Sequence, residues 1–261
     1  MRWVDTMLYI NDSSSCCLVP LKSPLLHLYM ISLTQVLGQP TVLVSFAASF
    51  LVLGGSFLLF RYHLCREDSV KQERQSSWFL TLVSSLICTI VSIPFVIQFC
   101  HADLDMELLA MDSRFHTGFV CFFISYLILD LLLGSIYYPK RITLMTGWVH
   151  HLFYIFTLSW FPRLQISSMF TVISILELPT LVLAAGSMAQ AWRSDLLFGS
   201  TFFVLRLVVH AWMTVALKRY YRIQFMWIIA VIVYPLHIYW FYGFVQAQIK
   251  KIASKRKAPA T

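Results

Sequence analysis

Seven long apolar segments make up most of the chain, and only short connections and the two terminal regions lie outside them. Each holds about twenty predominantly apolar residues, the length that an α-helix needs to cross the hydrocarbon core of a bilayer. They are Thr41–Tyr62, Trp78–Phe99, His116–Tyr138, Ile142–Phe161, Ile166–Ala191, Leu197–Leu217 and Phe225–Val245. Because these runs are continuous rather than short and alternating, they exclude the strands of a membrane β-barrel. The sequence therefore predicts an all-α membrane protein with about seven transmembrane helices.

Composition excludes the other classes to which such a chain could belong. Of the 261 residues, 59% are hydrophobic and only 12% are charged, whereas about 25% are charged in a typical soluble domain. So few charges cannot cover a water-soluble globule, and such high hydrophobicity excludes a disordered chain. The net charge of +8 does not indicate nucleic-acid binding, because the basic residues lie between the apolar segments and in the C-terminal tail. The six cysteines form no CxxC pair and no metal-ligand spacing, so we expect neither a disulfide framework nor a metal site.

Lysine and arginine are unequally divided between the two sides of the predicted membrane. Twelve lie in the loops after the first, third and fifth segments and in the C-terminal tail, and seven lie on the other side. The positive-inside rule therefore predicts a cytosolic C-terminus and a lumenal N-terminus. Asn11 begins a formal glycosylation sequon on the predicted lumenal side.

Ionisable side chains inside the apolar segments are the most informative feature of the sequence. They are Asp130, His150, His151, Glu177, Arg206, His210 and His237, contributed by five of the seven segments. A charged group at the centre of a helix costs about 2.5–3.5 kcal/mol on insertion scales and usually faces a bundle interior or a wet cavity. These residues therefore predict a polar site inside the membrane.

Residue counting brings several of these side chains to the same depth. Asp130 and His150 each lie eight residues from the short loop between the third and fourth segments, which places both about 12 Å from that end of the hairpin. An Asp and the His150-His151 pair can therefore meet across antiparallel helices. Glu177 and Arg206 both fall near the midplane, where each can compensate the charge of the other.

Two helical faces carry polar residues at three- and four-residue steps. They are Thr143, Gly147, His150, Tyr154 and Thr157 on one segment, and Arg206, His210 and Thr214 on another. Glu177 is followed by Pro179, which removes a backbone hydrogen bond and predicts a kink beside a cavity. Together these features predict a central polar chamber that opens toward the cytosol.

Structural roles explain some of the same residues. Polar side chains also join transmembrane helices by hydrogen bonds, and packing is the simpler interpretation of His237 beside Tyr234 and Trp240. An ion pair of purely structural value explains Glu177 and Arg206 as well as a site does. Adjacent histidines are different, because neighbours on a helix diverge by about 100° and one contact cannot explain both.

Five sequence segments, in this order and spacing, resemble the TLC domain family over residues 78 to 248. They are ISYLILDLLLG, GWVHHLFYIFTLSW, ILELPTLVL, LLFGSTFFVLRLVVHAW and YPLHIYWFYGFV. Within the family, the chain is most similar to the small TLC domain-containing proteins, which are relatives of the ceramide synthases. The His pair, with an Asp upstream and a Glu-x-Pro downstream, carries most of this resemblance.

The resemblance implies a TLC-type helical barrel formed by the last six helices and lipid-related work, usually in the endoplasmic reticulum. It divides the chain into four parts. They are a lumenal or interfacial N-terminal segment (1–40), a first transmembrane helix with a cytosolic loop (41–77), the TLC domain (78–248) and a basic cytosolic tail (249–261). In ceramide synthases the His pair lies in an intramembrane tunnel, and His150 and His151 match it.

Three functions agree with this reading. The first is membrane lipid homeostasis through a chamber that holds a lipid or acyl chain without a cofactor, with Tyr154, Glu177, Arg206, His210 and His237 as lipid contacts. The second is acyl-CoA-dependent N-acylation of a sphingoid base, with acyl-CoA as co-substrate, His150 or His151 as base or acyl acceptor, and Asp130 orienting it. Against it, the chain lacks the His-Asp dipeptide that follows the pair in those enzymes. The third is a non-enzymatic membrane partner, such as a cargo receptor.

Overall fold

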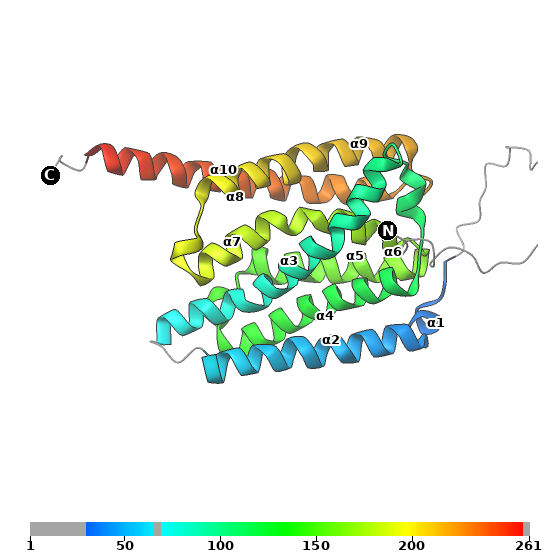
Figure 1. Cartoon of the computed structure of the whole chain (residues 1–261), viewed down its shortest axis with the longest axis horizontal. Helices are drawn as coiled ribbons and strands as arrows, with labels where there is room; N and C mark the ends of the chain where they lie inside the picture. The colour runs from blue at the N-terminus through cyan, green and yellow to red at the C-terminus, as the bar shows by residue number, and fades with distance from the viewer. Residues whose placement is uncertain (1–29, 65–68, 258–261) are drawn as a thin grey trace, which may run out of the picture.

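The structure is a computed structural model that describes residues 30–64 and 69–257 (Figure 1). Within these ranges the chain is helical and contains no strand. The α-helices are α1 (Leu33–Leu37), α2 (Pro40–Leu59), α3 (Ser69–His101), α4 (Arg114–Tyr137), α5 (His150–Leu164), α6 (Ser167–Ile173), α7 (Leu178–Met188), α8 (Asp195–Thr201), α9 (His210–Tyr220) and α10 (Met226–Lys257). The Asn11 sequon, Cys16, Cys17 and Cys65 lie outside the described residues.

Shorter helical turns of other types continue or join these helices. Three are π-helical: η1 (Phe60–Leu64), η4 (Leu144–Val149) and η7 (Phe202–Val209). Four are 3-10 turns: η2 (Met106–Ala110), η3 (Pro139–Arg141), η5 (Ser174–Glu177) and η6 (Gln190–Trp192). The wider turns of η4 and η7 lead directly into α5 and α9, so each of those spans is one helix with an irregular first part.

Six helical segments among the described residues are long and apolar enough to cross a bilayer. They are Pro40–His63, Val70–His101, Arg114–Tyr137, Ser167–Met188, Asp195–Tyr220 and Met226–Ser254. They confirm an integral, multi-pass helical membrane protein. Seven spans were expected, and the fourth of them, Ile142–Phe161, is the one that is missing. It is helical as η4 and α5 but is not among the six, because two adjacent histidines and several weakly polar residues lower its mean hydropathy.

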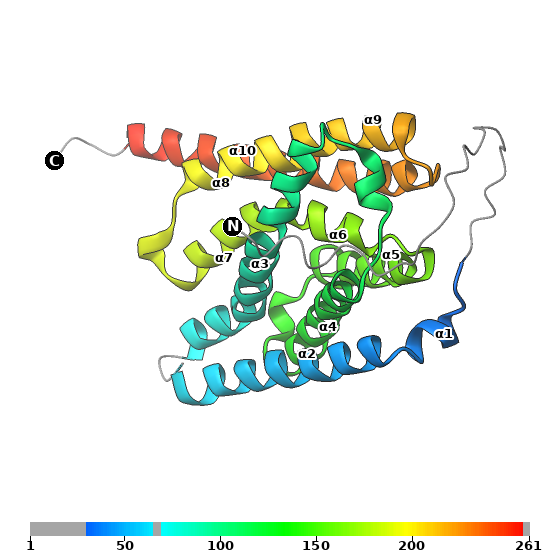
Figure 2. The same ribbon diagram turned by 45° about the vertical axis from the view of Figure 1, so that its right-hand side comes forward.

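The helices lie side by side with their connections at two ends of the bundle (Figure 1). Helix α2 packs on α4 at one side, while α8, η7, α9 and α10 lie on the opposite side (Figure 2). Between these layers α3 packs on α7 and α4 packs on α5. The ring of His150 lies 5.3 Å from that of Trp240, which brings α5 to α10.

Large apolar side chains cover the outer faces of the spans. Leu51, Val52, Ile136 and Leu196 are each at least two-thirds exposed. Soluble proteins seldom expose apolar surface on this scale, whereas lipid chains solvate it. The exposed faces therefore agree with a bilayer around the bundle.

The predicted interruption beside Glu177 is confirmed. Helix α6 ends at Ile173, the 3-10 turn η5 follows, and α7 starts at Leu178 with Pro179 in its first turn. Proline has no N–H to donate to the preceding turn and its ring clashes with that turn's carbonyl, which favours a kink or a break at this point. The tighter turn places Glu177 at the junction of two helices.

Ile142 is wedged between two glycines where α4 turns back toward η4. A Cβ atom on Gly134 would overlap the Ile142 side chain and lie 2.8 Å from Tyr138 Cε2, and one on Gly147 would lie 2.5 Å from Ile142 Cγ2. These glycines are needed for close approach rather than for an unusual backbone angle. The contact fixes the hairpin that carries Asp130 and His151.

Substitution of Gly134 by alanine is expected to lower the free energy of unfolding by about 1–3 kcal/mol, the usual cost of an overpacked core. Gly55→Ala is the matched control, because nothing lies within 4 Å of a Cβ there and alanine is favoured over glycine in a helix by about 1 kcal/mol. Unfolding in mixed micelles of detergent and SDS would measure both. Equal effects of the two substitutions would contradict the close approach.

Candidate functional site

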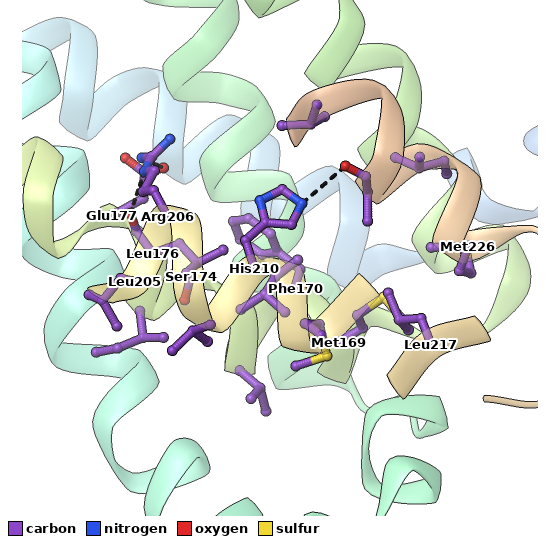
Figure 3. Close-up of a pocket in the computed structure, with 18 of the residues that line it drawn as sticks. Met169, Phe170, Ser174, Leu176, Glu177, Leu205, Arg206, His210, Leu217 and Met226 are labelled. Atoms are coloured by element: carbon purple, nitrogen blue, oxygen red, sulfur yellow. Dashed lines mark hydrogen bonds and ion pairs between the residues drawn. The ribbon is translucent and has the colours of Figure 1, made fainter. Parts of the chain in front are cut away.

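A cavity of about 430 Å³ lies inside the bundle and is here called the central cavity (Figure 3). Its walls come from α3, α4, α5, α6 with η5, η7 with α9, and α10, while α2 contributes none of them. Most lining side chains are apolar, among them Phe161, Met169, Phe170, Leu217 and Met226. The cavity is therefore suited to an apolar ligand.

The polar side chains of the central cavity gather near the middle of the spans. Tyr154, Glu177, Arg206, His210 and His237, the five residues predicted as lipid contacts, all line it. Figure 3 shows Glu177 and Arg206 together at one end of the view and Leu217 and Met226 at the other, with His210 between them. The cavity thus has one polar end and a long apolar remainder.

Arg206 is the centre of the polar end. Its Nη2 donates to Glu177 Oε1 at 2.8 Å and to Thr180 Oγ1 at 2.8 Å, and its Nε donates to the Leu176 carbonyl at 2.8 Å. The arginine side chain is only 6% exposed. The predicted compensation of charge between Glu177 and Arg206 is therefore confirmed, with further acceptors that satisfy a buried guanidinium.

His237 and His210 extend this network, and their partners fix where their protons lie. Arg206 Nη1 can only donate, so His237 Nε2, 3.2 Å away, must accept. The proton of neutral His237 is then on Nδ1, which lies 3.1 Å from the Arg206 carbonyl and 3.0 Å from His210 Nδ1. His210 in turn donates from Nε2 to the Ala230 carbonyl at 3.1 Å. Each histidine is thus a neutral tautomer, assigned from its partners.

His237 packs beside Trp240, with 6.1 Å between the two rings, and it also makes hydrogen bonds. Its side chain is 1% exposed and joins the arginine network instead of serving only as filler between aromatic rings. Sequence reasoning missed this role because it depends on which faces α9 and α10 turn toward each other. It also missed Thr180, although its position three residues after Glu177 places both on one face of a helical turn.

Helical irregularities place the members of this network. Glu177 ends the 3-10 turn η5, Arg206 lies within the π-helical turn η7, and Pro235 precedes His237 by two residues inside α10. Interrupted helices free backbone carbonyls for side chains, as the Leu176 carbonyl is used here. π-Helical turns are rare and frequently occur at functional sites.

The predicted contact between Asp130 and the histidine pair is confirmed for His151 alone. His151 Nε2 lies 3.4 Å from Asp130 Oδ2, and Tyr138 donates its hydroxyl to Asp130 Oδ1 at 3.1 Å. His151 Nδ1 donates to the Gly147 carbonyl at 2.8 Å. Asp130 is therefore held by Tyr138 and lies beside the ring of His151.

His150 points the other way, as the divergence of neighbouring helical residues predicts. Its ring packs against Tyr154 at 4.7 Å and Trp240 at 5.3 Å. Its buried Nδ1 has no hydrogen-bond partner among the described residues. Asp130, His150 and His151 do not line the central cavity. The candidate catalytic residues therefore lie outside the cavity wall, and His150 touches it through Tyr154.

Comparison with known protein families, with curated proteins and with solved structures found no match for this chain. Its function must therefore be argued from its own geometry. Within the described ranges, no group of three His, Cys, Asp or Glu side chains is placed to hold a metal ion.

The apolar part of the central cavity extends toward one end of the bundle. Its walls there include Cys100, Leu104, Phe161 and Met226, which lie toward the end that carries the loop 102–113. Lysine and arginine counting predicts that this end is lumenal. The cytosolic opening of the chamber stays a prediction.

Proposed function

We propose that the protein binds one long-chain lipid or acyl group in the central cavity and acts in membrane lipid homeostasis. The observation that carries this proposal is a cavity that is apolar along its length and holds its ionised groups, Glu177 and Arg206, at one end. Its volume of about 430 Å³ falls within the usual range of small-molecule sites. A long-chain lipid with a small polar head has the same arrangement of one polar end and a long apolar part.

The length of the cavity supports a chain of the kind found in membrane lipids. Arg206 and Leu217 both line it and are separated by eleven residues, or about 16 Å along a helix. One leaflet is half of a hydrocarbon core about 30 Å thick, so the two lengths are similar. The cavity therefore fits the depth of a single leaflet.

Membership of the TLC domain family is part of the proposal. The resemblance over residues 78–248 supports it, and so does the origin of the cavity walls, which α3 and later helices supply without α2. A barrel of the last six helices, a location in the endoplasmic reticulum and a cytosolic C-terminus are proposed on the same grounds.

Binding is favoured over acyl transfer. Neither His150, His151 nor Asp130 lines the cavity, and His151 is engaged with Asp130 and the Gly147 carbonyl. A general base must come within hydrogen-bond reach of the group that it deprotonates. A chain held in the central cavity meets Tyr154 and the arginine network first.

A neighbouring pair of valines provides the test. Val209 lines the cavity, whereas Val208 is 51% exposed on the outer face of the same helix. Tryptophan at position 209 would fill the space that a chain needs, and tryptophan at 208 would lie among lipid chains. We expect Val209→Trp to reduce saturable labelling by a photoreactive fatty-chain probe by about tenfold or more, and Val208→Trp to leave it unchanged.

The purified protein in phosphatidylcholine nanodiscs would be labelled with and without an excess of unlabelled chain. Only the portion that the excess removes reports on a specific site, because the outer faces meet lipid everywhere. The labelled positions, mapped by mass spectrometry, should fall on residues that line the cavity. Labelling that does not saturate, or that both tryptophan variants reduce equally, would contradict the proposal.

A further inference from the structure

The polar end of the central cavity carries no net charge. Glu177 and Arg206 are joined at 2.8 Å, so one negative and one positive charge cancel. His210 and His237 are both neutral, because their hydrogen-bond partners leave one proton on each ring. A head group that enters this end therefore meets a balanced pair rather than a free charge.

The same network leaves two hydrogen-bonding positions unused. Arg206 has five N–H groups, and four of them donate to the Leu176 carbonyl, His237, Glu177 and Thr180. One N–H on Nη1 has no acceptor within the described part of the chain. Glu177 accepts through Oε1, and its Oε2 accepts from no described residue, while its side chain is 22% exposed and lines the cavity.

We propose that the cavity selects a long chain whose head is an uncharged hydroxyl group, as in a long-chain alcohol or a monoacylglycerol, over a chain that ends in a carboxylate or an ammonium group. This inference rests on the proposed function and specifies the ligand of the same cavity. A hydroxyl donates one hydrogen bond and accepts others, which complements one free carboxylate oxygen and one free N–H.

Charge explains why the two ions are disfavoured. A carboxylate would find Arg206 already paired with Glu177, and an ammonium would find Glu177 already paired with Arg206. Either ion would bring an uncompensated charge to the middle of the spans, where charges are expensive. An uncharged head adds hydrogen bonds without that penalty.

Three ligands with one chain length test this proposal on the unmodified protein. Tetradecan-1-ol, tetradecanoate and tetradecylamine would compete with the photoreactive probe in nanodiscs at about pH 8, where the acid is ionised and the amine is protonated. We expect the alcohol to compete at a concentration at least about tenfold lower than either ion. A smaller difference, or a preference for an ion, would overturn the head-group inference.

The two proposals fail in different ways. If none of the three ligands competes and Val209→Trp leaves labelling intact, the cavity binds no chain and the proposed function fails. If the ions compete as well as the alcohol while Val209→Trp abolishes labelling, chain binding stands and only the head-group inference falls.

A charge-changing pair of variants provides an independent measure. Glu177→Gln would leave the positive charge of Arg206 uncompensated, so preference should move toward tetradecanoate by about tenfold. Glu73→Gln makes the same chemical change at an exposed ion pair with Arg141, outside the cavity, and should leave the order of the ligands unchanged. A shift in both variants, or in neither, would count against the proposal. The comparison on the unmodified protein stands even where Glu177→Gln fails to fold.

Discussion

Replacement of Arg206 by methionine is expected to lower the free energy of unfolding by about 3–5 kcal/mol, the usual cost of breaking a buried ion pair from one side. The substitution keeps an unbranched apolar stem but removes the donors that Glu177, Thr180 and the Leu176 carbonyl accept. Glu177 would then remain as an unpaired carboxylate near the middle of the membrane. Most of the expected loss of stability comes from that unpaired carboxylate.

A double substitution separates the cost of leaving Glu177 unpaired from the net contribution of the ion pair to stability. Arg206→Met combined with Glu177→Leu should recover much of the loss, because apolar replacement of both partners of a buried pair is often nearly neutral. Arg193→Met is the control: its ion pair with Asp195 involves a side chain that is 55% exposed, and such pairs contribute about 0–1 kcal/mol. Unfolding in mixed micelles would measure these three variants together with Glu177→Leu alone. Losses that simply add in the double variant would contradict the coupling.

Asp130→Ala is expected to have the second-largest effect on stability. Asp130 accepts from Tyr138 and contacts His151, so the Tyr138 hydroxyl would lose its acceptor and His151 its neighbouring carboxylate inside the bundle. A buried donor left without a partner costs about 1–3 kcal/mol. We therefore expect a loss well above that of Tyr138→Phe, which removes one hydroxyl together with its hydrogen bond and costs about 1 kcal/mol.

The same unfolding measurement distinguishes the two substitutions at this site. The rank order of the two losses is the test. Asp130→Ala strands the Tyr138 hydroxyl and removes the carboxylate beside His151, whereas Tyr138→Phe strands no donor and leaves Asp130 beside His151. Equal losses for the two variants would show that His151 does not depend on Asp130.

Contacts within one hairpin could be predicted from the sequence. The Asp130–His151 contact follows from counting residues on both sides of a short connection, since two antiparallel helices must place equal counts at equal depth. The Glu177–Arg206 pair follows from similar counting, helped by the cost of leaving either charge alone. The depth of a residue in the membrane can be counted directly along the sequence of a helix.

Rotation about the helix axes could not be predicted in the same way. The partner of His237 depends on the π-helical turn η7, which contains Arg206 and changes the direction of the side chains that follow it, beginning with His210. The place of the cavity depends on the combined volumes of side chains from six helical segments. Neither quantity is contained in hydropathy, so the polar stripes indicated a polar site but not the apolar cavity beside it.

Helix α4 shows what burial means for a chain dissolved in lipid. In the most apolar window of its span, 61% of the residues are buried inside the protein, against 17% for the span of α2 and 11% for that of α10. Helices α2, α3, α5 and α6 all pack on α4, so most substitutions there change a protein contact. At the exposed positions of α2 and α10 one apolar side chain can replace another, because lipid tails accommodate any shape. Tolerance to mutation should therefore vary several-fold among spans that look alike in a hydropathy plot.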